Sequence, residues 1–381
     1  MIVDNSSSLP NGLKCCIDWL SFTARTDMPL TKVCKLLGYS LSDFTFADRG
    51  AFGYVSQLVR NDCKGLKVLY NDPDICDRTD MGVHIECSSS ALLDLLEHFR
   101  QSRCDEIGVY NSGEDGYFSV VLDFLHMLYE NAFSLSRIDL AVDDYGADYF
   151  TVSELYDLYR SGAISSRFRS AQYIAGFEQS PDAPHASGDT LYLGSNKSEV
   201  KLRIYDKQAE QNKKRKACGE PLIDTAWTRF ELEVHGSYAN KVLSSLLEAG
   251  RTCAEPLSVV CAGTLANYMR VINLDNERKS RCSIHEKWQA FISDIEKISL
   301  YEKPEPKTYD DRLCWLKKTV SASLALVVAH DHGSFDTIYD LIIKGREKLV
   351  ASASHLKDYN EFISAVEFFM APLPYEFGDA C

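Results

Sequence analysis

Three short segments of the sequence place charged or polar residues at every second position. They read SRIDLAVDD (136–144), KLRIYDK (201–207) and TRFELEVH (228–235). Because successive side chains of a β-strand point to opposite faces, each segment predicts one apolar and one polar face. The polar faces would carry Arg137, Asp139 and Asp143 in the first segment, Arg203, Tyr205 and Lys207 in the second, and Arg229, Glu231, Glu233 and His235 in the third.

Tyr205 is the residue of this set that could act as a nucleophile on a phosphodiester. A free phenol has a pKa near 10, so about one molecule in a thousand is ionised at neutral pH. Lowering that pKa to about 7 requires about 4 kcal/mol. One metal ion and two nearby cations can supply this energy at an effective dielectric constant near 20. Arg203 and Lys207 flank Tyr205 as those two cations, and both side chains bind phosphate oxygens well.

The carboxylates of the other two segments predict a metal site beside Tyr205. If the three strands are neighbours, Asp139, Asp143, Glu231 and Glu233 lie on one floor and cannot all remain ionised without a compensating charge. Oxygen ligands of this kind suit Mg²⁺ or Mn²⁺, which would polarise a phosphodiester. The alternative is an antiparallel sheet with a solvated charged face, in which Tyr205 only packs against its cross-strand neighbours.

A basic segment follows in the same region of a chain that is acidic overall. The net charge of −14 opposes non-specific binding to nucleic acid, so any DNA contact must come from a local basic patch. Residues 197–216 hold eight Lys or Arg against three Asp or Glu. Taken alone this is a solvated helix face, but its position around Tyr205 favours a DNA contact. The candidate DNA-binding residues are Lys197, Lys201, Lys213, Lys214, Arg215 and Lys216.

The elements expected around these segments indicate an α+β fold. Strand patterns fill residues 15–235, with residues 163–188 expected as a loop, and helical patterns fill the rest of the chain. Two prolines mark a linker near 301–311. The segment CIDWLSF and the later HIEC resemble RIDLAVD and the later FELEV. Two duplicated halves would explain this echo, and so would chance similarity between strands.

Several other classes of protein are not indicated. The 13 cysteines form no C-x-x-C pair, and the sequence contains no phosphate-binding G-x-x-x-x-G-K-[ST] loop, which argues against a zinc ribbon and an ATP motor. No apolar leader or membrane-length apolar run occurs, so a cytoplasmic protein with reduced thiols is expected. His330 and His332 mimic a metal pair, but their position at a helix end favours an interaction with the helix dipole.

The order of SRIDLAVDD, TLYLGSNKSEVKLRIYDKQAEQ and WTRFELEVHG resembles the replication initiation factor family, often called Rep_trans. GVHIECSS resembles an upstream strand of the same family. The family covers rolling-circle plasmid Rep proteins, filamentous-phage replication proteins and relaxases of conjugative elements. The resemblance extends over roughly residues 14–275 and depends on the motifs jointly, since each motif alone is weak.

The resemblance implies an antiparallel, relaxase-like sheet and a nick in one strand of an origin, with a tyrosine bound to the 5′ phosphate until the strand is rejoined. Tyr205 matches the nucleophile, and Arg203 and Lys207 match its flanking cations. Asp139 and Glu231 match acidic positions near the metal, with Glu233 and Asp143 as further members. The usual relaxase histidine cluster is missing. We therefore expect a nicking domain at 1–275 and a helical region at 276–381.

Three functions and several partners remain open from the sequence. The first function is the nicking initiator, the second a catalytically inactive, sequence-specific DNA-binding regulator of the same fold, and the third an unrelated scaffold. Origin DNA is the expected partner, together with a host helicase recruited by the helical tail and a second copy of the chain. Three aromatic residues in or near the loop before the tyrosine strand are expected to stack on unpaired bases, with hydrophobic packing as the alternative. They are Tyr173, Phe177 and Tyr192.

Overall fold

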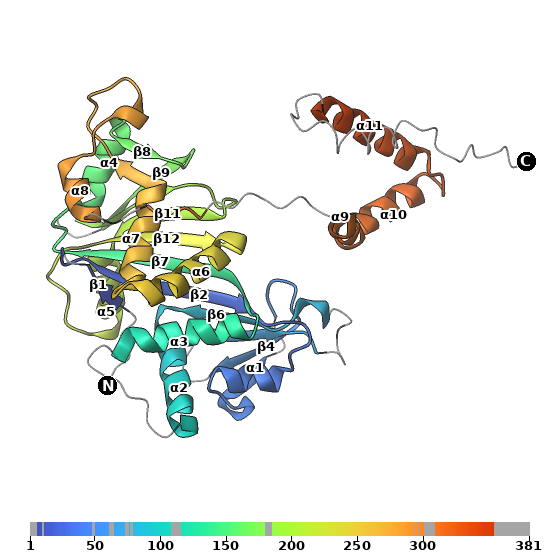
Figure 1. Ribbon diagram of the computed structural model, residues 1–381, viewed down its shortest axis with the longest axis horizontal. Coiled ribbons are helices and arrows are strands. Elements are labelled where there is room, and N and C mark those ends of the chain that lie inside the picture. Colours follow the sequence, from blue (N-terminus) through green and yellow to red (C-terminus); the bar gives the residue numbers. More distant parts are fainter. Residues whose placement is uncertain are drawn as a thin grey trace, which may run out of the picture. The chain divides into compact units, whose positions relative to one another are not determined.

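The computed structural model describes residues 6–9, 11–47, 50–60, 65–72, 76, 79–107, 116–179, 185–293, 295, 297–300 and 309–353. The chain divides into two compact units, Met1–Tyr301 and Glu302–Cys381 (Figure 1). Every helix in the described residues is too short or too polar to span a bilayer.

The first unit is built on one antiparallel sheet of eleven strands. The strand order is β3-β4-β5-β6-β2-β7-β12-β11-β10-β9, with β1 paired to β2, and β8 pairs with β13 in a separate small sheet. The predicted α+β class with a large antiparallel sheet is therefore confirmed. The strands are β1 (Ser6–Ser8), β2 (Lys14–Thr23), β3 (Phe44–Ala47), β4 (Ser56–Arg60), β5 (Leu66–Tyr70), β6 (His84–Ser88), β7 (Ser134–Tyr145), β8 (Ile164–Ser166), β9 (Ala171–Glu178), β10 (His185–Leu193), β11 (Val200–Asp206), β12 (Trp227–His235) and β13 (Met269–Val271).

The same order of elements occurs twice along the sheet. A first half runs β2, α1 (Leu30–Leu36), β3 to β6 and α2 (Ser89–Ile107); a second runs β7, α4 (Val152–Arg160), β9 to β12 and α6 (Gly236–Thr252). The first half lies in the sheet as 3-4-5-6-2 and the second as 9-10-11-12-7, so β2 and β7 pair in the centre. The sequence echo noted above falls on these corresponding strands.

Helices cover one face of the sheet. α3 (Gly116–Glu130), α6 and α7 (Pro256–Tyr268) lie across the central strands (Figure 1). Phe22 of β2 meets Phe124 of α3 edge to face, with ring centroids 5.9 Å apart, and Phe230 of β12 packs on Phe291 at 4.7 Å. Burying each such side chain stabilises the fold by about 1.5–3 kcal/mol. The apolar alternation of the sequence therefore faces this helical layer and leaves the polar alternation on the opposite face.

The expectation of a loop at 163–188 is wrong. β8, β9 and the start of β10 fall within this range, and β9 forms the edge of the sheet through its pairing with β10. None of the residues of β9 is fully buried. It therefore lacks the alternation of buried and exposed residues by which a strand covered on one face is recognised from sequence. Its strand conformation depends instead on its pairing with β10.

The first compact unit extends beyond the predicted boundary at residue 275. α8 (Glu286–Ile292) belongs to it, because Trp288 and Phe291 are buried and stack on each other with centroids 5.3 Å apart. Leu300 is also fully buried. The structure places the division after Tyr301, whereas the functional extent of the nicking domain stays a prediction.

The described part of the second unit is helical, as expected. Most of the predicted linker at 301–311 lies outside the described residues. Several large apolar side chains of this unit are exposed, among them Leu326, Phe335 and Tyr339. Its helical elements are α9 (Tyr309–Trp315), a π-helical turn (Leu316–Val320), α10 (Ser321–His330) and α11 (Asp336–Ala353).

Candidate active site

The three strands that carry the predicted site lie side by side in the order β7, β12, β11. Their register brings the polar residues into direct cross-strand pairs: Asp139 is opposite Glu233, Arg203 is opposite Glu231, and Tyr205 is opposite Arg229. Side chains on directly opposed residues lie about 4.5–5.5 Å apart at their Cβ atoms. The polar floor expected from alternation therefore exists in the structure.

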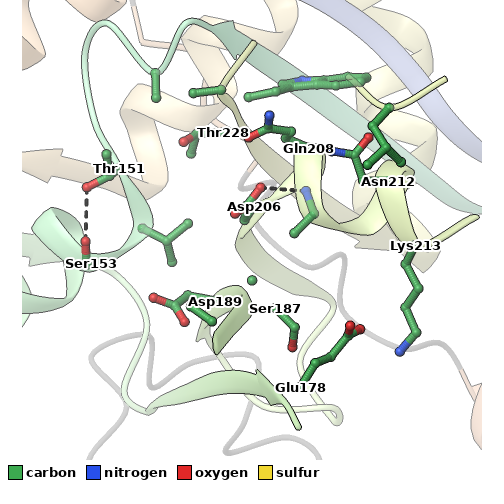
Figure 2. Close-up of a pocket in the computed structure, with 18 of the residues that line it drawn as sticks. Thr151, Ser153, Glu178, Ser187, Asp189, Asp206, Gln208, Asn212, Lys213 and Thr228 are labelled. Atoms are coloured by element: carbon green, nitrogen blue, oxygen red, sulfur yellow. Dashed lines mark hydrogen bonds between the residues drawn. The ribbon is translucent and has the colours of Figure 1, made fainter. Parts of the chain in front are cut away.

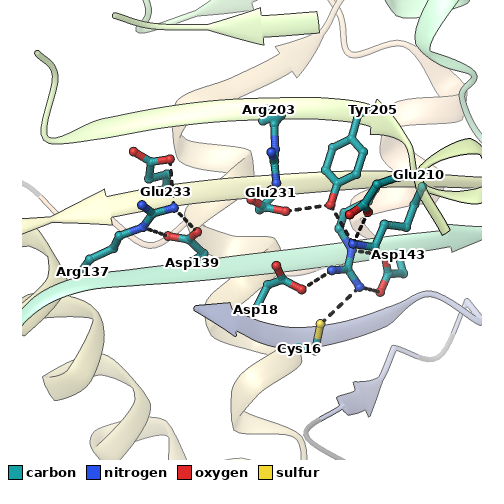
Figure 3. Close-up of polar contacts among 12 residues, drawn as sticks. Cys16, Asp18, Arg137, Asp139, Asp143, Arg203, Tyr205, Glu210, Glu231 and Glu233 are labelled. Carbon is teal, nitrogen blue, oxygen red and sulfur yellow. Dashed lines mark hydrogen bonds and ion pairs between the residues drawn. The ribbon is translucent and has the colours of Figure 1, made fainter. Parts of the chain in front are cut away.

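Tyr205 lies at the centre of a network of charged side chains (Figure 3). Its hydroxyl donates a hydrogen bond to Glu231 Oε2 at 3.0 Å and accepts one from Lys207 Nζ at 3.1 Å. The Arg203 guanidinium lies 4.4 Å from the centre of the ring and also donates to Glu231 Oε1 at 2.6 Å. The three predicted catalytic residues are thus brought together, with Arg203 at the ring of Tyr205 and Lys207 at its hydroxyl.

The start of α5 (Lys207–Cys218) holds Lys207 in place. Asp206 caps this helix by accepting a hydrogen bond from the backbone N–H of Ala209 at 2.8 Å. Lys207 is buried at the first helical position, where the helix dipole disfavours a cation. Glu210 offsets this cost with ion pairs of 2.5 Å to Lys207 and to Lys214. Burial alone would raise the pKa of Glu210, but these lysines outweigh it and lower the pKa to about 2.

The protein keeps Tyr205 as a neutral phenol. Burial raises the pKa of Tyr205 above its ordinary value, and the charge of Glu231 raises it further. Arg229 and Arg203 oppose this shift but do not overcome it. The flanking cations alone therefore do not produce the lowered pKa on which the sequence argument relied. Glu231 instead accepts the hydrogen bond of the neutral phenol.

A second cluster of charged side chains lies on the neighbouring strands β7 and β12. Arg137 donates two hydrogen bonds to Asp139, at 2.8 and 2.6 Å, and one to Glu233 at 3.1 Å, while Glu233 also contacts His235 Nε2 at 2.8 Å. Burial raises the pKa of Asp139 to about 7 although Arg137 opposes it, and the charges of Glu231 and Glu233 add to the rise. Burial is the main cause of this rise, and the ion pair with Arg137 only partly offsets it.

A buried ionic clamp fixes the floor beneath Tyr205. Arg229 binds Asp143 with two hydrogen bonds of 2.7 Å and binds Asp18 at 2.5 Å. Trp227 Nε1 donates to the same Asp143 at 2.7 Å. Neither Asp18 nor this arginine is predicted from the sequence to have a role in the site. A bulge between Ile17 and Trp19 in β2 accounts for the position of Asp18, and no local sequence pattern signals that bulge.

The four predicted metal ligands all have protein partners. Asp143 is held by Arg229, Asp139 by Arg137, Glu231 by Arg203, and Glu233 by Arg137 and His235. Across the residues that the structure describes, no three His, Cys, Asp or Glu side chains converge as a metal site requires. Asp143 does not fit a ligand role because both its oxygens bind Arg229. The other three carboxylates are held by Arg137, Arg203 and His235, so their role as metal ligands stays a prediction.

The predicted DNA-binding residues fall into two groups. Lys197 and Lys201 belong to the β10–β11 hairpin, whereas Lys213, Lys214, Arg215 and Lys216 lie on α5. Lys213 and Lys216 line a cavity of about 580 Å³, which Figure 2 shows with Lys213 and Glu178 on one side and Thr151 and Ser153 on the other. Arg215 is used structurally, because it donates to the carbonyl of Pro221 at 2.8 Å.

The remaining candidates take different positions. Tyr173 stacks on Tyr156 of α4 at 3.9 Å and donates to Asp189, which is a packing role, whereas Phe177 is 69% exposed. Tyr192 lies opposite Arg203 on the polar face. His330 is exposed at the end of α10 and contacts Asp331 at 3.3 Å.

Comparisons with known proteins identify relatives of this chain. The profile of the replication initiation factor family, Rep_trans, matches residues 133–343. The chain is 26% identical to the provisionally named DNA relaxase NicK of Bacillus subtilis (strain 168) over 344 residues, covering 90% of this chain and 89% of the relative. The solved rolling-circle replication initiator protein from Geobacillus stearothermophilus matches with a TM-score of 0.57 at 25% identity, covering 76% of this chain and 100% of the other.

Proposed function

Because this chain belongs to the replication initiation factor family of rolling-circle initiators and relaxases, we propose that it nicks one strand of its origin DNA with Tyr205 and later rejoins that strand. One observation carries the assignment of the nucleophile: the Tyr205 hydroxyl is held between the carboxylate of Glu231 and the ammonium of Lys207. A tyrosine that only packed in a sheet would not need a proton acceptor and a cation on the same oxygen.

The arrangement supports a balanced transfer of the phosphoryl group. The Tyr205 oxygen attacks the phosphorus, its proton passes to Glu231, and the bond from phosphorus to the 3′ oxygen breaks. That oxygen takes up a proton and leaves as a free 3′ hydroxyl, while the 5′ phosphate stays bound to the tyrosine. Arg203 and Lys207 stabilise the charge that grows on the phosphate oxygens. Rejoining is the reverse reaction, because the phosphotyrosine bond keeps the energy of the broken bond.

A divalent metal is part of this proposal. Asp139, Glu231 and Glu233 would hold Mg²⁺ or Mn²⁺ in place of Arg137 and Arg203, and the ion would neutralise charge on the phosphodiester. The test is calorimetric titration of the free protein with MnCl₂, which needs no DNA. Binding that disappears in Asp139→Asn supports the assignment. Binding that is unchanged in this variant would remove Asp139 from the ligand set.

A catalytically inactive DNA-binding regulator is the second candidate. Its support is that Tyr205 is only 4% exposed and has a raised pKa, as expected of a tyrosine that is not used in chemistry. The intact contacts of Tyr205 with Glu231 and Lys207 favour the nicking enzyme, since a binding protein gains nothing from them.

One experiment separates the two candidates. The full chain is incubated with supercoiled plasmid carrying the DNA that flanks its own gene, with Mg²⁺ or Mn²⁺, and the products are examined for open circles and an SDS-resistant protein–DNA adduct. We expect the adduct with wild type and with Tyr159→Phe, which removes a hydroxyl on α4, and no adduct with Tyr205→Phe. An adduct in Tyr205→Phe would move the chemistry to another residue, and specific binding without nicking would favour the regulator.

Origin DNA is the partner that the family implies, and two protein partners belong to the proposal as well. The exposed apolar side chains of the second unit, such as Leu326 and Phe335, suit contact with a host helicase or with a second copy of the chain. Light scattering of wild type and Leu326→Glu tests the second copy, and a monomeric wild type would exclude it.

A further inference from the structure

We propose that the unpaired strand beside the nick lies in a trough that runs from Tyr205 along β10 and β11 to Arg167 and Arg169. This inference depends on the nicking function proposed above and adds the path of the DNA to it. The ligand is single-stranded DNA, recognised by its phosphates and by the flat faces of its bases. Three adjoining cavities of the second half of the sheet form this trough.

The cavities follow one another because they share lining residues. The inner cavity of about 200 Å³ contains Tyr205 and Arg203, and it shares Tyr192 with a middle cavity of about 360 Å³. The middle cavity shares Gly194 and Ser195 with an outer cavity of about 530 Å³. The inner cavity is lined by Thr190, Tyr192, Arg203 and Tyr205 and also by the carboxylates of Asp189, Asp206 and Glu210. Lining residues of the other two cavities are Gln172, Asn196 and Lys201 in the middle, and Arg167, Phe168, Arg169, Tyr238 and Tyr268 outside.

The register of the hairpin sets the length of the trough. Thr190 is opposite Tyr205 and Tyr192 is opposite Arg203, so the polar residues of β11 are spaced regularly from the nucleophile outward. The four steps along the chain from Tyr205 to Lys201 span about 13 Å at the rise of a β-strand. This length equals about four nucleotides at the 3.4 Å spacing of a stacked strand. The trough therefore suits the few nucleotides next to the scissile phosphate.

Aromatic rings at two places along the trough can stack on bases. Tyr192 is half-buried, and Lys201 Nζ lies 4.6 Å from the centre of its ring, so the lysine keeps the ring in a fixed position on the floor. In the outer cavity, Phe168 and Tyr268 are nearly parallel, at 24° and 5.5 Å between centroids. Stacking on such rings is the usual way in which proteins hold unpaired bases without reading their sequence.

Cations are available for phosphates where the trough opens. Arg167 and Arg169 are exposed, and neither forms an ion pair with a carboxylate in the described part of the chain. The guanidinium of Arg167 lies 5.9 Å from the centre of the Tyr268 ring, which directs a positive charge over an aromatic surface. Glu199 is the carboxylate that lines the outer cavity. Duplex DNA is disfavoured as the ligand, because its paired bases cannot reach the rings.

The test is a binding measurement that does not depend on cleavage. Fluorescence anisotropy is followed with a labelled oligothymidylate of about 12 nucleotides and with a duplex of equal length, over a series of KCl concentrations. The parent protein is the full chain with Tyr205→Phe, which keeps the ring and prevents an adduct. The trough variants are Arg167→Gln/Arg169→Gln and Tyr192→Leu. The matched control is Arg251→Gln/Arg281→Gln, two exposed arginines that line none of the three cavities.

Each variant has its own expected result. Removing Arg167 and Arg169 weakens single-strand binding about tenfold and lowers the salt slope by about 1.4, since each phosphate contact on a single strand contributes about 0.7. Tyr192→Leu weakens binding about tenfold and leaves the slope unchanged. The control variant binds like the parent, and the duplex binds more weakly than the single strand throughout.

The outcomes distinguish the trough from the proposed function. Trough variants that bind the oligonucleotide like the parent, or equal losses for the duplex, would overturn the trough even if the wild type forms its adduct. Conversely, the expected losses together with a wild type that forms no adduct on any substrate would keep the trough and remove the nicking function.

Discussion

The two halves of the sheet have the same order of elements but different chemistry at corresponding positions. In the second half, Arg203 is opposite Glu231 and Tyr205 is opposite Arg229; in the first half, Lys67 is opposite Glu86 and Leu69 is opposite His84. The ion pair is present in both, at 2.6 Å for Arg203 and 3.4 Å for Lys67. The first half therefore has the carboxylate and its cation but an apolar residue in place of the nucleophile.

The difference extends to the support of the site. In the second half, Arg229 is clamped by the buried carboxylate of Asp143 and by the half-buried carboxylate of Asp18, which reaches it from β2. At the corresponding place in the first half, His84 Nδ1 makes a hydrogen bond of 2.9 Å with Thr23, and burial lowers the pKa of His84 so that it stays neutral. The shared architecture thus places side chains equally well in both halves. A nucleophile and a dense ionic network are what distinguish the half with the proposed active site.

The largest expected difference between the halves concerns their central glutamates. Glu231→Gln removes the acceptor of the Tyr205 proton and should slow nicking by about 10²- to 10⁴-fold, the usual contribution of a general base. Glu86→Gln, the matched change in the first half, should leave the rate within about twofold. Initial rates of open-circle formation on supercoiled origin plasmid measure both. Equal losses in the two variants would mean that both halves take part in the chemistry.

A second contrast concerns stability. Arg229→Met leaves the buried Asp143 and the half-buried Asp18 without their cation, which should cost about 3–5 kcal/mol of unfolding free energy. His84→Leu loses one hydrogen bond to Thr23 and should cost about 1 kcal/mol. Urea unfolding followed by tryptophan fluorescence compares the two. A cost below about 1 kcal/mol for Arg229→Met would show that the two carboxylates are solvated or protonated once the arginine is gone.

A third contrast is in the dependence of stability on pH. The pKa of Asp139 is raised from 3.8 in the unfolded chain to about 7 in the fold, so the folded state binds the extra proton between these values. The contribution of Asp139 is therefore fully present below pH 3.8 and is lost as the pH rises to about 7. The unfolding free energy of wild type relative to Asp139→Asn should fall with a slope of up to about 1.4 kcal/mol per pH unit, and then level off.

Urea titrations of wild type and Asp139→Asn at pH 5, 6, 7 and 8 would measure this slope. A difference between the two proteins that stays constant from pH 5 to pH 8 would show that Arg137 keeps Asp139 ionised throughout.

The sequence predicted the floor of the site better than its surroundings. Period-two alternation over residues 136–144, 201–207 and 228–235 was sufficient, because a strand covered by helices on one face can orient only one way. The ion pair between Arg229 and Asp143 could not be predicted from the sequence, because it joins residues that are 86 positions apart. Asp18 depends on a bulge, and β9 is held by its neighbour without any buried residue of its own.

The smallest expected effect is that of Lys67, whose ion pair with Glu86 is the first-half counterpart of the pair between Arg203 and Glu231. Lys67 has a side chain that is 44% exposed and meets Glu86 at 3.4 Å, so solvent screens the pair and Lys67→Gln should change the unfolding free energy by less than about 1 kcal/mol. Arg203→Gln removes a partner from the nearly buried Glu231 and a cation from the ring of Tyr205. We expect nicking to fall at least tenfold in Arg203→Gln and to remain unchanged in Lys67→Gln. A loss of nicking in Lys67→Gln at unchanged stability would instead indicate that the first half binds the DNA substrate, because that lysine touches no residue of the proposed active site.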